Sequence, residues 1–286
     1  DEADARYELA LAAARQAGDK ELEGAFLQHQ GSLADDRRQF TRAATLYQQA
    51  LQLFQAAGNQ AGMMQTYNLL GVVEQNAGRL AEARAWYEKS RGLAVALKDQ
   101  RSLGTAAQNI GIVCQLEGEA AREQGNEPAA RLKFQAALRS VEESLQIKQA
   151  RGNKPDAAAS FGQLARIHIC LGDLAAAERH AHEARQIRES LGLKEVAKTY
   201  GVLSQIAEAR GDTAAAAEWA QKRDAKLAEL ERLAGGGGGL PSQILQALHA
   251  LTIACAQAGF SNQPLDAAIE EHLAALDKAP APSPEF

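Results

Sequence analysis

The chain has 286 residues, of which 46% are hydrophobic, 5% are aromatic and only seven are prolines, a composition typical of helices that pack through small side chains. Its formal net charge is −5, and acidic and basic residues alternate along it. Proteins that bind nucleic acid present a basic face, so no nucleic-acid partner is expected. No stretch approaches the roughly 20 apolar residues of a membrane span, so no membrane partner is expected either.

The cysteines indicate the cellular compartment of the protein, and the two ends of the sequence indicate whether it is part of a longer chain. Cys114, Cys170 and Cys255 lie far apart in apolar stretches, and their odd number leaves at least one unpaired in any disulfide scheme. This usage favours a reducing, cytoplasmic location. The sequence begins at Asp1 without Met and ends in Glu285-Phe286 after a Pro/Ala-rich run, as expected of a piece excised from a longer protein.

Residues 1–20 predict the second helix of a truncated hairpin. Tyr7 and Gly18 occupy the places that Tyr47 and Gly58 occupy in the next unit. A helix without its hairpin partner leaves an apolar face uncovered, so self-association through exposed terminal helices is an expected risk.

The segment up to residue 234 repeats with a period of about forty residues. Gly31, Gly71 and Gly111 are forty residues apart, and the helical patterns around them align. The pattern of residues 67–83 returns at 161–177, and again from Tyr200. The second half of each unit repeats at 43–58, 83–99, 137–153 and 177–192. Because one hairpin cannot bury its own apolar face, five stacked hairpins are predicted, with small residues where the helices cross.

The third hairpin contains an insertion of fourteen residues around 117–130. Gly125 to Pro128 form a turn signal with Pro at a helix start. The spacing therefore predicts that both helices of this hairpin are about two turns longer than the others.

These small, aromatic and turn positions resemble the tetratricopeptide repeat (TPR) family, and the long period resembles the variety found in kinesin light chains and spindle-orientation scaffolds. The resemblance implies an all-α fold: a right-handed superhelical α-solenoid of antiparallel helix hairpins. It also implies that the first helix of each hairpin lines a concave groove in which a partner peptide or helix is held.

The pattern stops after Leu233. Five glycines at 235–239 predict a flexible linker, and apolar stripes in 240–278 predict a helical pair that is either a degenerate repeat or a cap. Residues 279–286 are predicted to be disordered.

Candidate catalytic and metal-binding groups are weak. His180 and His182 are two residues apart on a helix and point in different directions, so solvated surface is expected there and no metal site. Glycines 235–239 lack the Lys-Ser/Thr of a phosphate loop, and no nucleophile, base and acid can be grouped. We therefore expect no enzyme activity and no cofactor.

The resemblance assigns peptide-binding roles to polar residues of the first helices. Carboxamides carry a donor and an acceptor together, so a ladder of them can bond the main chain of a bound peptide, the alternative being that they are simply solvated. Arg166 and Lys198 lie toward the C-terminal end, where they would meet an acidic group on the ligand. The expected groove residues are Gln28, His29, Asn68, Gln75, Gln108, Asn109, Gln115, Gln163, Arg166, Lys198 and Gln205.

The leading hypothesis is therefore a protein–protein interaction scaffold with a protein or peptide ligand in its groove. One alternative is a regulatory or sensor segment of a larger signalling enzyme whose catalytic domain lies elsewhere. Another is autoinhibition, in which the helices after the glycine linker occupy the groove.

Overall fold

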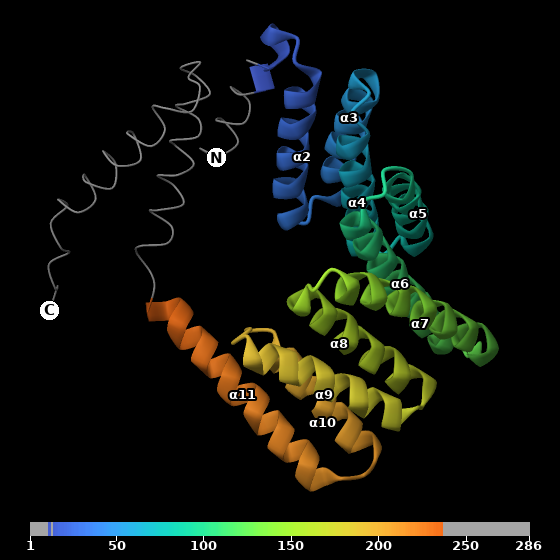
Figure 1. The fold of residues 1–286 in the computed structure, drawn as a ribbon, viewed down its shortest axis with the longest axis vertical. Helices are drawn as coiled ribbons and strands as arrows, with labels where there is room; N and C mark the ends of the chain where they lie inside the picture. Colours follow the sequence, from blue (N-terminus) through green and yellow to red (C-terminus); the bar gives the residue numbers. More distant parts are fainter. Residues whose placement is uncertain (1–10, 13, 237–286) are drawn as a thin grey trace, which may run out of the picture. The chain divides into compact units, whose positions relative to one another are not determined.

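A computed structural model describes residues 11, 12 and 14–236, and within them it is helical with no strand (Figure 1). The chain forms two units, Asp1–Arg223 and Asp224–Phe286. The helices are α2 (Lys20–Asp36), α3 (Phe40–Ala57), α4 (Gln60–Asn76), α5 (Leu80–Ala96), α6 (Gln100–Glu123), α7 (Glu127–Ala150), α8 (Lys154–Leu171), α9 (Leu174–Ser190), α10 (Val196–Ala209) and α11 (Thr213–Gly236).

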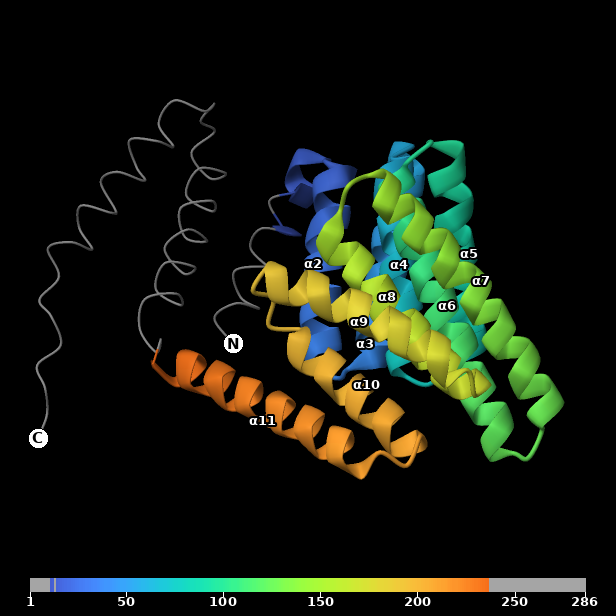
Figure 2. The same ribbon diagram turned by 60° about the horizontal axis from the view of Figure 1, so that its bottom comes forward.

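The first unit is the predicted solenoid, in which α2–α3, α4–α5, α6–α7, α8–α9 and α10 with the start of α11 are consecutive antiparallel hairpins (Figures 1 and 2). Of the second unit, the structure describes Asp224–Gly236, the end of α11, where Lys226 pairs with Glu229 at 2.9 Å. The helix includes the first two glycines of the predicted linker. The rest of that linker, the helical pair 240–278, the tail 279–286 and most of the predicted truncated helix lie outside the described residues.

Small residues let the two helices of a hairpin approach closely, as the spacing predicts. A Cβ atom at Gly31 would lie 2.5 Å from the Tyr47 ring, and one at Gly71 would lie 2.4 Å from the Tyr87 ring. Both tyrosines are buried, so each ring fills the space that its glycine leaves. These contacts repeat along the stack and build its core.

The insertion lengthens one hairpin, as predicted. Helices α6 and α7 have 24 residues each, whereas α4 and α5 have 17, and the end of this hairpin extends beyond its neighbours (Figure 2). The added turns have their own glycine–aromatic contact, because a Cβ atom at Gly118 would lie 2.6 Å from the Phe134 ring. The insertion therefore extends the core and is not a loop.

The turns between helices use a recurrent cap. Asp or Asn accepts a hydrogen bond from a backbone N–H of the following helix at Asp19, Asn59, Asp99, Asn126, Asn153, Asp173 and Asp212. The residue before the cap usually has a left-handed backbone and is glycine, as at Gly58. Arg38 and Lys98 are the non-glycine residues in this conformation among those that the structure describes, with φ of 58° and 54°.

Replacing Arg38 with glycine is expected to stabilise the protein. An L-residue with a left-handed backbone costs about 1 kcal/mol or more relative to glycine, so Arg38→Gly should raise the free energy of unfolding by about 0.5–1 kcal/mol. Urea unfolding followed by circular dichroism measures the change. The matched control is Gly78→Arg at the equivalent turn, where a Cβ would meet nothing within 4 Å, so its loss of stability isolates the backbone term.

The first helices form the inner side of the first unit. Helix α2 contacts α4, α6 contacts α8, and α8 contacts α10, so first helices of neighbouring hairpins touch one another. In a curved stack the elements on the inside lie closest together. This inner face, made by α2, α4, α6, α8 and α10, is the one on which the predicted ligand site falls. Within the part of the chain that the structure describes, no helix combines the length and the apolar character needed to cross a membrane.

Candidate functional site

Several of the predicted amides bond to each other or to neighbouring repeats. Gln28 Nε2 donates to Thr66 Oγ1 at 2.7 Å, joining α2 to α4. Asn109 Nδ2 donates to Asn68 Oδ1 at 2.9 Å, joining α6 to α4. These bonds make part of the amide ladder a connection between hairpins.

The connection continues from α6 to α8. Gln163 Nε2 donates to Gln115 Oε1 at 2.5 Å, and Gln115 Nε2 donates to Glu119 at 2.7 Å. Gln108 Oε1 accepts from Ser160 Oγ at 2.7 Å and from Lys148 Nζ at 3.2 Å. The predicted row of amides is therefore partly a buried hydrogen-bond network that fixes the register of the stack.

The predicted groove residues differ in their exposure to solvent. Gln28, Gln115 and Gln163 are buried, so the structure assigns them internal partners and little surface. Asn68, Gln75, Gln108 and Asn109 are half-buried, and Gln75 accepts from the Tyr87 hydroxyl at 3.2 Å. The exposed members are His29, Arg166, Lys198 and Gln205.

A recess of about 550 Å³ opens between α2 and α4. Gln28 and Gln65 supply polar groups to it, while Leu22 and Phe54 supply apolar surface. Gly62 permits this arrangement, because a Cβ atom there would lie 2.6 Å from the Phe54 ring. The recess contains one of the predicted residues, and Asp19, Glu21 and Asn59 also line it, so its surface is mixed polar and apolar.

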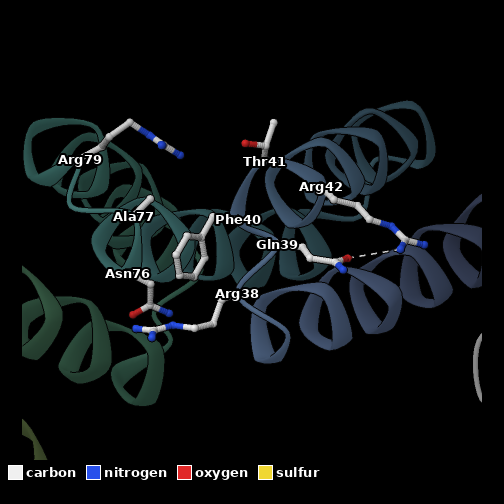
Figure 3. A pocket seen from close by; sticks show the side chains of 8 residues that line it. All are labelled: Arg38, Gln39, Phe40, Thr41, Arg42, Asn76, Ala77 and Arg79. Carbon is white, nitrogen blue, oxygen red and sulfur yellow. Dashed lines mark hydrogen bonds between the residues drawn. The ribbon is translucent and has the colours of Figure 1, made fainter.

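A second hollow, of about 580 Å³, lies at the α2–α3 and α4–α5 turns (Figure 3). Phe40 lies near its centre with Arg38, Arg42 and Arg79 around it (Figure 3). Arg42 donates to Gln39 at 3.3 Å, and Arg79 forms an ion pair with Glu74. Two of the three guanidinium groups are thus already engaged within the chain, and the hollow lies at the turns, away from the row of amides.

Two buried cations were missed by sequence reasoning. When the second helices of the repeats are aligned, Lys148 and Arg188 lie at the position that Phe54 occupies in the first repeat. Lys148 Nζ donates to Ser160 Oγ at 3.0 Å, and Arg188 Nη1 donates to Thr199 Oγ1 at 2.6 Å. Burial lowers the pKa of both side chains, because a low-dielectric environment disfavours the charged form.

The histidines of α8 and α9 form an aromatic stack, which corrects the prediction of solvated surface. His180 stacks on Phe161 at 5.9 Å and on His168 at 5.3 Å between ring centroids, and His182 packs edge-on against Trp219 at 6.1 Å. Within the described ranges, no group of three His, Cys, Asp or Glu side chains is placed to hold a metal ion. The stack packs α8 against α9 within one hairpin, and the His182–Trp219 contact joins this hairpin to the next.

This stack should make stability depend on pH. Burial lowers the pKa of His168 and His180 from 6.5, and each imidazole also neighbours the other. The unfolded chain then binds protons more readily, so the free energy of unfolding should fall as the pH drops below about 6.5 and level off above it. Urea titrations above and below that pH measure this. The variant His180→Trp carries the residue found at the equivalent positions Trp86 and Trp219. It should reduce the dependence of the free energy of unfolding on pH, and an unchanged dependence would mean that other groups cause it.

Comparison with known protein families identifies two of the repeats. The family model for the tetratricopeptide repeat matches residues 63–97 and 157–191. No curated protein is significantly similar to the chain in sequence. The described hairpins agree with these two matches, which cover α4–α5 and α8–α9.

Solved structures with the same fold include BtubC (BKLC) from P. vanneervenii, with a TM-score of 0.66 and 18% identity over 79% of this chain and 90% of that one. A structure of nearly identical, TPR-like kinesin-light-chain repeats from Podosopora anserina has a TM-score of 0.56 and 15% identity, over 72% of this chain and 95% of that one. The Rap conjugation gene regulator of plasmid pLS20, in complex with the Phr* peptide, has a TM-score of 0.58 and 14% identity, over 93% of this chain and 66% of that one. At these identities the similarity shows the fold. Two of the hairpins, α4–α5 and α8–α9, match the tetratricopeptide repeat model, and the chain shares the α-solenoid fold of these solved structures.

Proposed function

We propose that this protein is an interaction scaffold that binds a peptide or a short helix of a partner along the inner face of α2, α4, α6, α8 and α10. The observation that carries the proposal is the Asn68–Asn109 pair, half-buried on that face. Their mutual bond uses the Oδ1 of one and the Nδ2 of the other, so each amide retains a group that a peptide main chain can complete.

The surroundings of this pair support a peptide ligand. Exposed His29, Arg166, Lys198 and Gln205 come from three different first helices, α2, α8 and α10, so their side chains can contact separate parts of an extended ligand. The recess beside Gln28 lies at one end of these helices and offers polar and apolar surface to a ligand. The Rap regulator with a similar fold was solved with a peptide bound, which favours the same class of ligand here.

We infer a binding role without catalysis, because the inner face presents amides, cations and one histidine in place of a nucleophile with a base. Cys114 and Cys170 are free thiols, which favours a reducing compartment such as the cytoplasm. Membership of a larger signalling enzyme, self-association through terminal helices, and occupation of the inner face by residues 240–278 remain predictions.

Selection from a random peptide library displayed on phage tests the proposal. Enriched peptides are synthesised and titrated calorimetrically against the parent, against the inner-face variant Arg166→Ala/Lys198→Ala/Gln205→Ala, and against the outer-face variant Arg131→Ala/Arg139→Ala/Gln186→Ala. Both variants remove two cations and one exposed amide. The proposal predicts weaker binding of at least about tenfold for the inner-face variant alone. Failure to enrich any peptide, or equal loss with both variants, would refute it.

A further inference from the structure

The hollow at the α2–α3 and α4–α5 turns presents cations without a carboxylate (Figure 3). Three of the eight residues that line it are arginines, and the other five are uncharged. The chain as a whole has a formal net charge of −5, so this lining differs in sign from the average of the protein. A concave surface lined by one sign of charge attracts ligands of the opposite sign, which favours an anion here.

The arginine side chains retain hydrogen-bond donors for such a ligand. No hydrogen bond or ion pair joins the Arg38 guanidinium to another described residue. Arg42 donates through Nη1 to Gln39 at 3.3 Å. Arg79 donates through Nε to Glu74, which does not line the hollow. Because a guanidinium has five N–H donors, all three side chains keep terminal N–H groups that no described residue uses.

The two helices that begin at the hollow also lack the usual cap. The later second helices, α7, α9 and α11, are capped by Asn126, Asp173 and Asp212. Helices α3 and α5 begin after Gln39 and Arg79, and neither side chain bonds to its helix. The first-turn N–H groups that a cap would engage are therefore available to an external acceptor, and the partial positive charge of a helix start favours an anion.

Arg38 occupies a position that is glycine in the other hairpins. Its φ is 58°, and the corresponding turns have Gly78, Gly125, Gly172 and Gly211. A residue with a Cβ atom is strained in this left-handed conformation, and the Arg38 side chain makes no internal contact that offsets the strain. Stability therefore does not account for an arginine here, whereas a binding role does.

The hollow has an apolar centre between its cations. The half-buried Phe40 ring lies in the middle of it (Figure 3). The Arg38 side chain extends toward Asn76 on one side of the ring in this view, and Arg79 extends toward Thr41 on the other. The volume of about 580 Å³ is larger than an inorganic anion requires. An aromatic group of a ligand can pack on Phe40 while an anion attached to it bonds to a guanidinium.

We propose that this hollow binds a phosphate monoester whose carrier includes an aromatic ring, with Arg38 contacting the phosphate and Phe40 packing against the ring. Guanidinium groups and helix starts are the donors that proteins use for phosphate. The site lies at the turns and is separate from the inner face, so it does not depend on the peptide-binding function proposed above.

Phenyl phosphate is the probe that tests this proposal. It is titrated into the full chain while the backbone N–H resonances of Thr41 and Arg42 are followed by NMR, and inorganic phosphate and phenol are titrated as its two halves. The proposal predicts a saturable shift with phenyl phosphate, binding of inorganic phosphate that is weaker by roughly threefold or more, and no saturable shift with phenol. No saturable shift with phenyl phosphate, or an equal response to either half, would overturn it.

Two sources can supply this chemistry, a phosphotyrosine of a partner protein and a free nucleotide. A short phosphotyrosine peptide and adenosine monophosphate are titrated in the same way, each beside its unphosphorylated form. Tighter binding of the peptide assigns the site to a partner protein, and tighter binding of the nucleotide assigns it to a small molecule. Equal binding of the phosphorylated and unphosphorylated forms of both would overturn the proposal.

Arg38→Gly is the decisive variant, because it is expected to be more stable than the parent and yet to bind phenyl phosphate at least about tenfold more weakly. The matched control is Lys98→Gly at the α5–α6 turn, outside the hollow, where a cation also has a left-handed backbone, with φ of 54°. It removes the same charge and should change the affinity less than about twofold. Equal losses in both variants would assign the effect to net charge and overturn the site. Peptides selected for the inner face should bind both variants as they bind the parent, which separates failure of this site from failure of the proposed function.

Discussion

Phe134→Ala should lower the free energy of unfolding by about 3–5 kcal/mol, the usual cost of removing a large aromatic side chain from a packed core. The Phe134 ring is fully buried in the largest hydrophobic cluster, against Ala130 and Ala137. One edge of the ring fills the space over Gly118, and the Arg122 guanidinium lies 4.7 Å from its centroid. Truncation leaves a cavity that two straight helices cannot close by small movements.

Urea unfolding followed by circular dichroism measures this effect. The matched control is Leu132→Ala, two residues earlier on α7, whose side chain is 66% exposed. The control should change stability by no more than about 0.5 kcal/mol. A loss of less than about 1 kcal/mol for Phe134→Ala would show that the extended hairpin is not part of the common core.

Alanine at Gly71 should destabilise the protein by about 1–3 kcal/mol, although alanine is the better helix former. The added methyl group would lie 2.4 Å from Cε1 of Tyr87, whose buried ring cannot move away without displacing the core. Gly92→Ala is the matched control on the exposed face of α5, where a Cβ meets nothing within 4 Å.

The same chemical change should therefore have opposite signs at the two sites. Gly92→Ala should raise stability by about 0.5–1 kcal/mol, because glycine in a helix interior costs conformational entropy. Thermal and urea unfolding of the two variants decide the matter. Two stabilised variants would mean that α4 and α5 do not cross at Gly71.

The hairpins were predictable because their determinants are local and repeat. Three local features recur at fixed spacing: the contact of Gly71 with Tyr87, the Asn59 cap and the Gly58 turn. Each repeat therefore shows the same pattern independently. The length of α6 and α7 followed in the same way from the size of the insertion.

The site was less predictable because it depends on which residues meet between hairpins. Spacing places Gln28, Gln115 and Gln163 on the inner helices, but their burial depends on how closely neighbouring hairpins approach. A carboxamide that bonds across two hairpins has the same sequence pattern as one that faces solvent. Arg188 was missed because cations on second helices are usually solvated, and only the packing of α8 and α10 around it shows that it is buried.

Cross-linking tests most directly whether a ligand binds the inner face. A photoreactive benzoylphenylalanine is placed at Gln205 on α10 or, as control, at Gln186 on α9, both exposed positions, and each protein is irradiated with a selected peptide. The account predicts a peptide adduct from position 205, suppressed by excess unlabelled peptide, and none from position 186. An adduct from position 186 alone would contradict it and place the ligand on the outer helices.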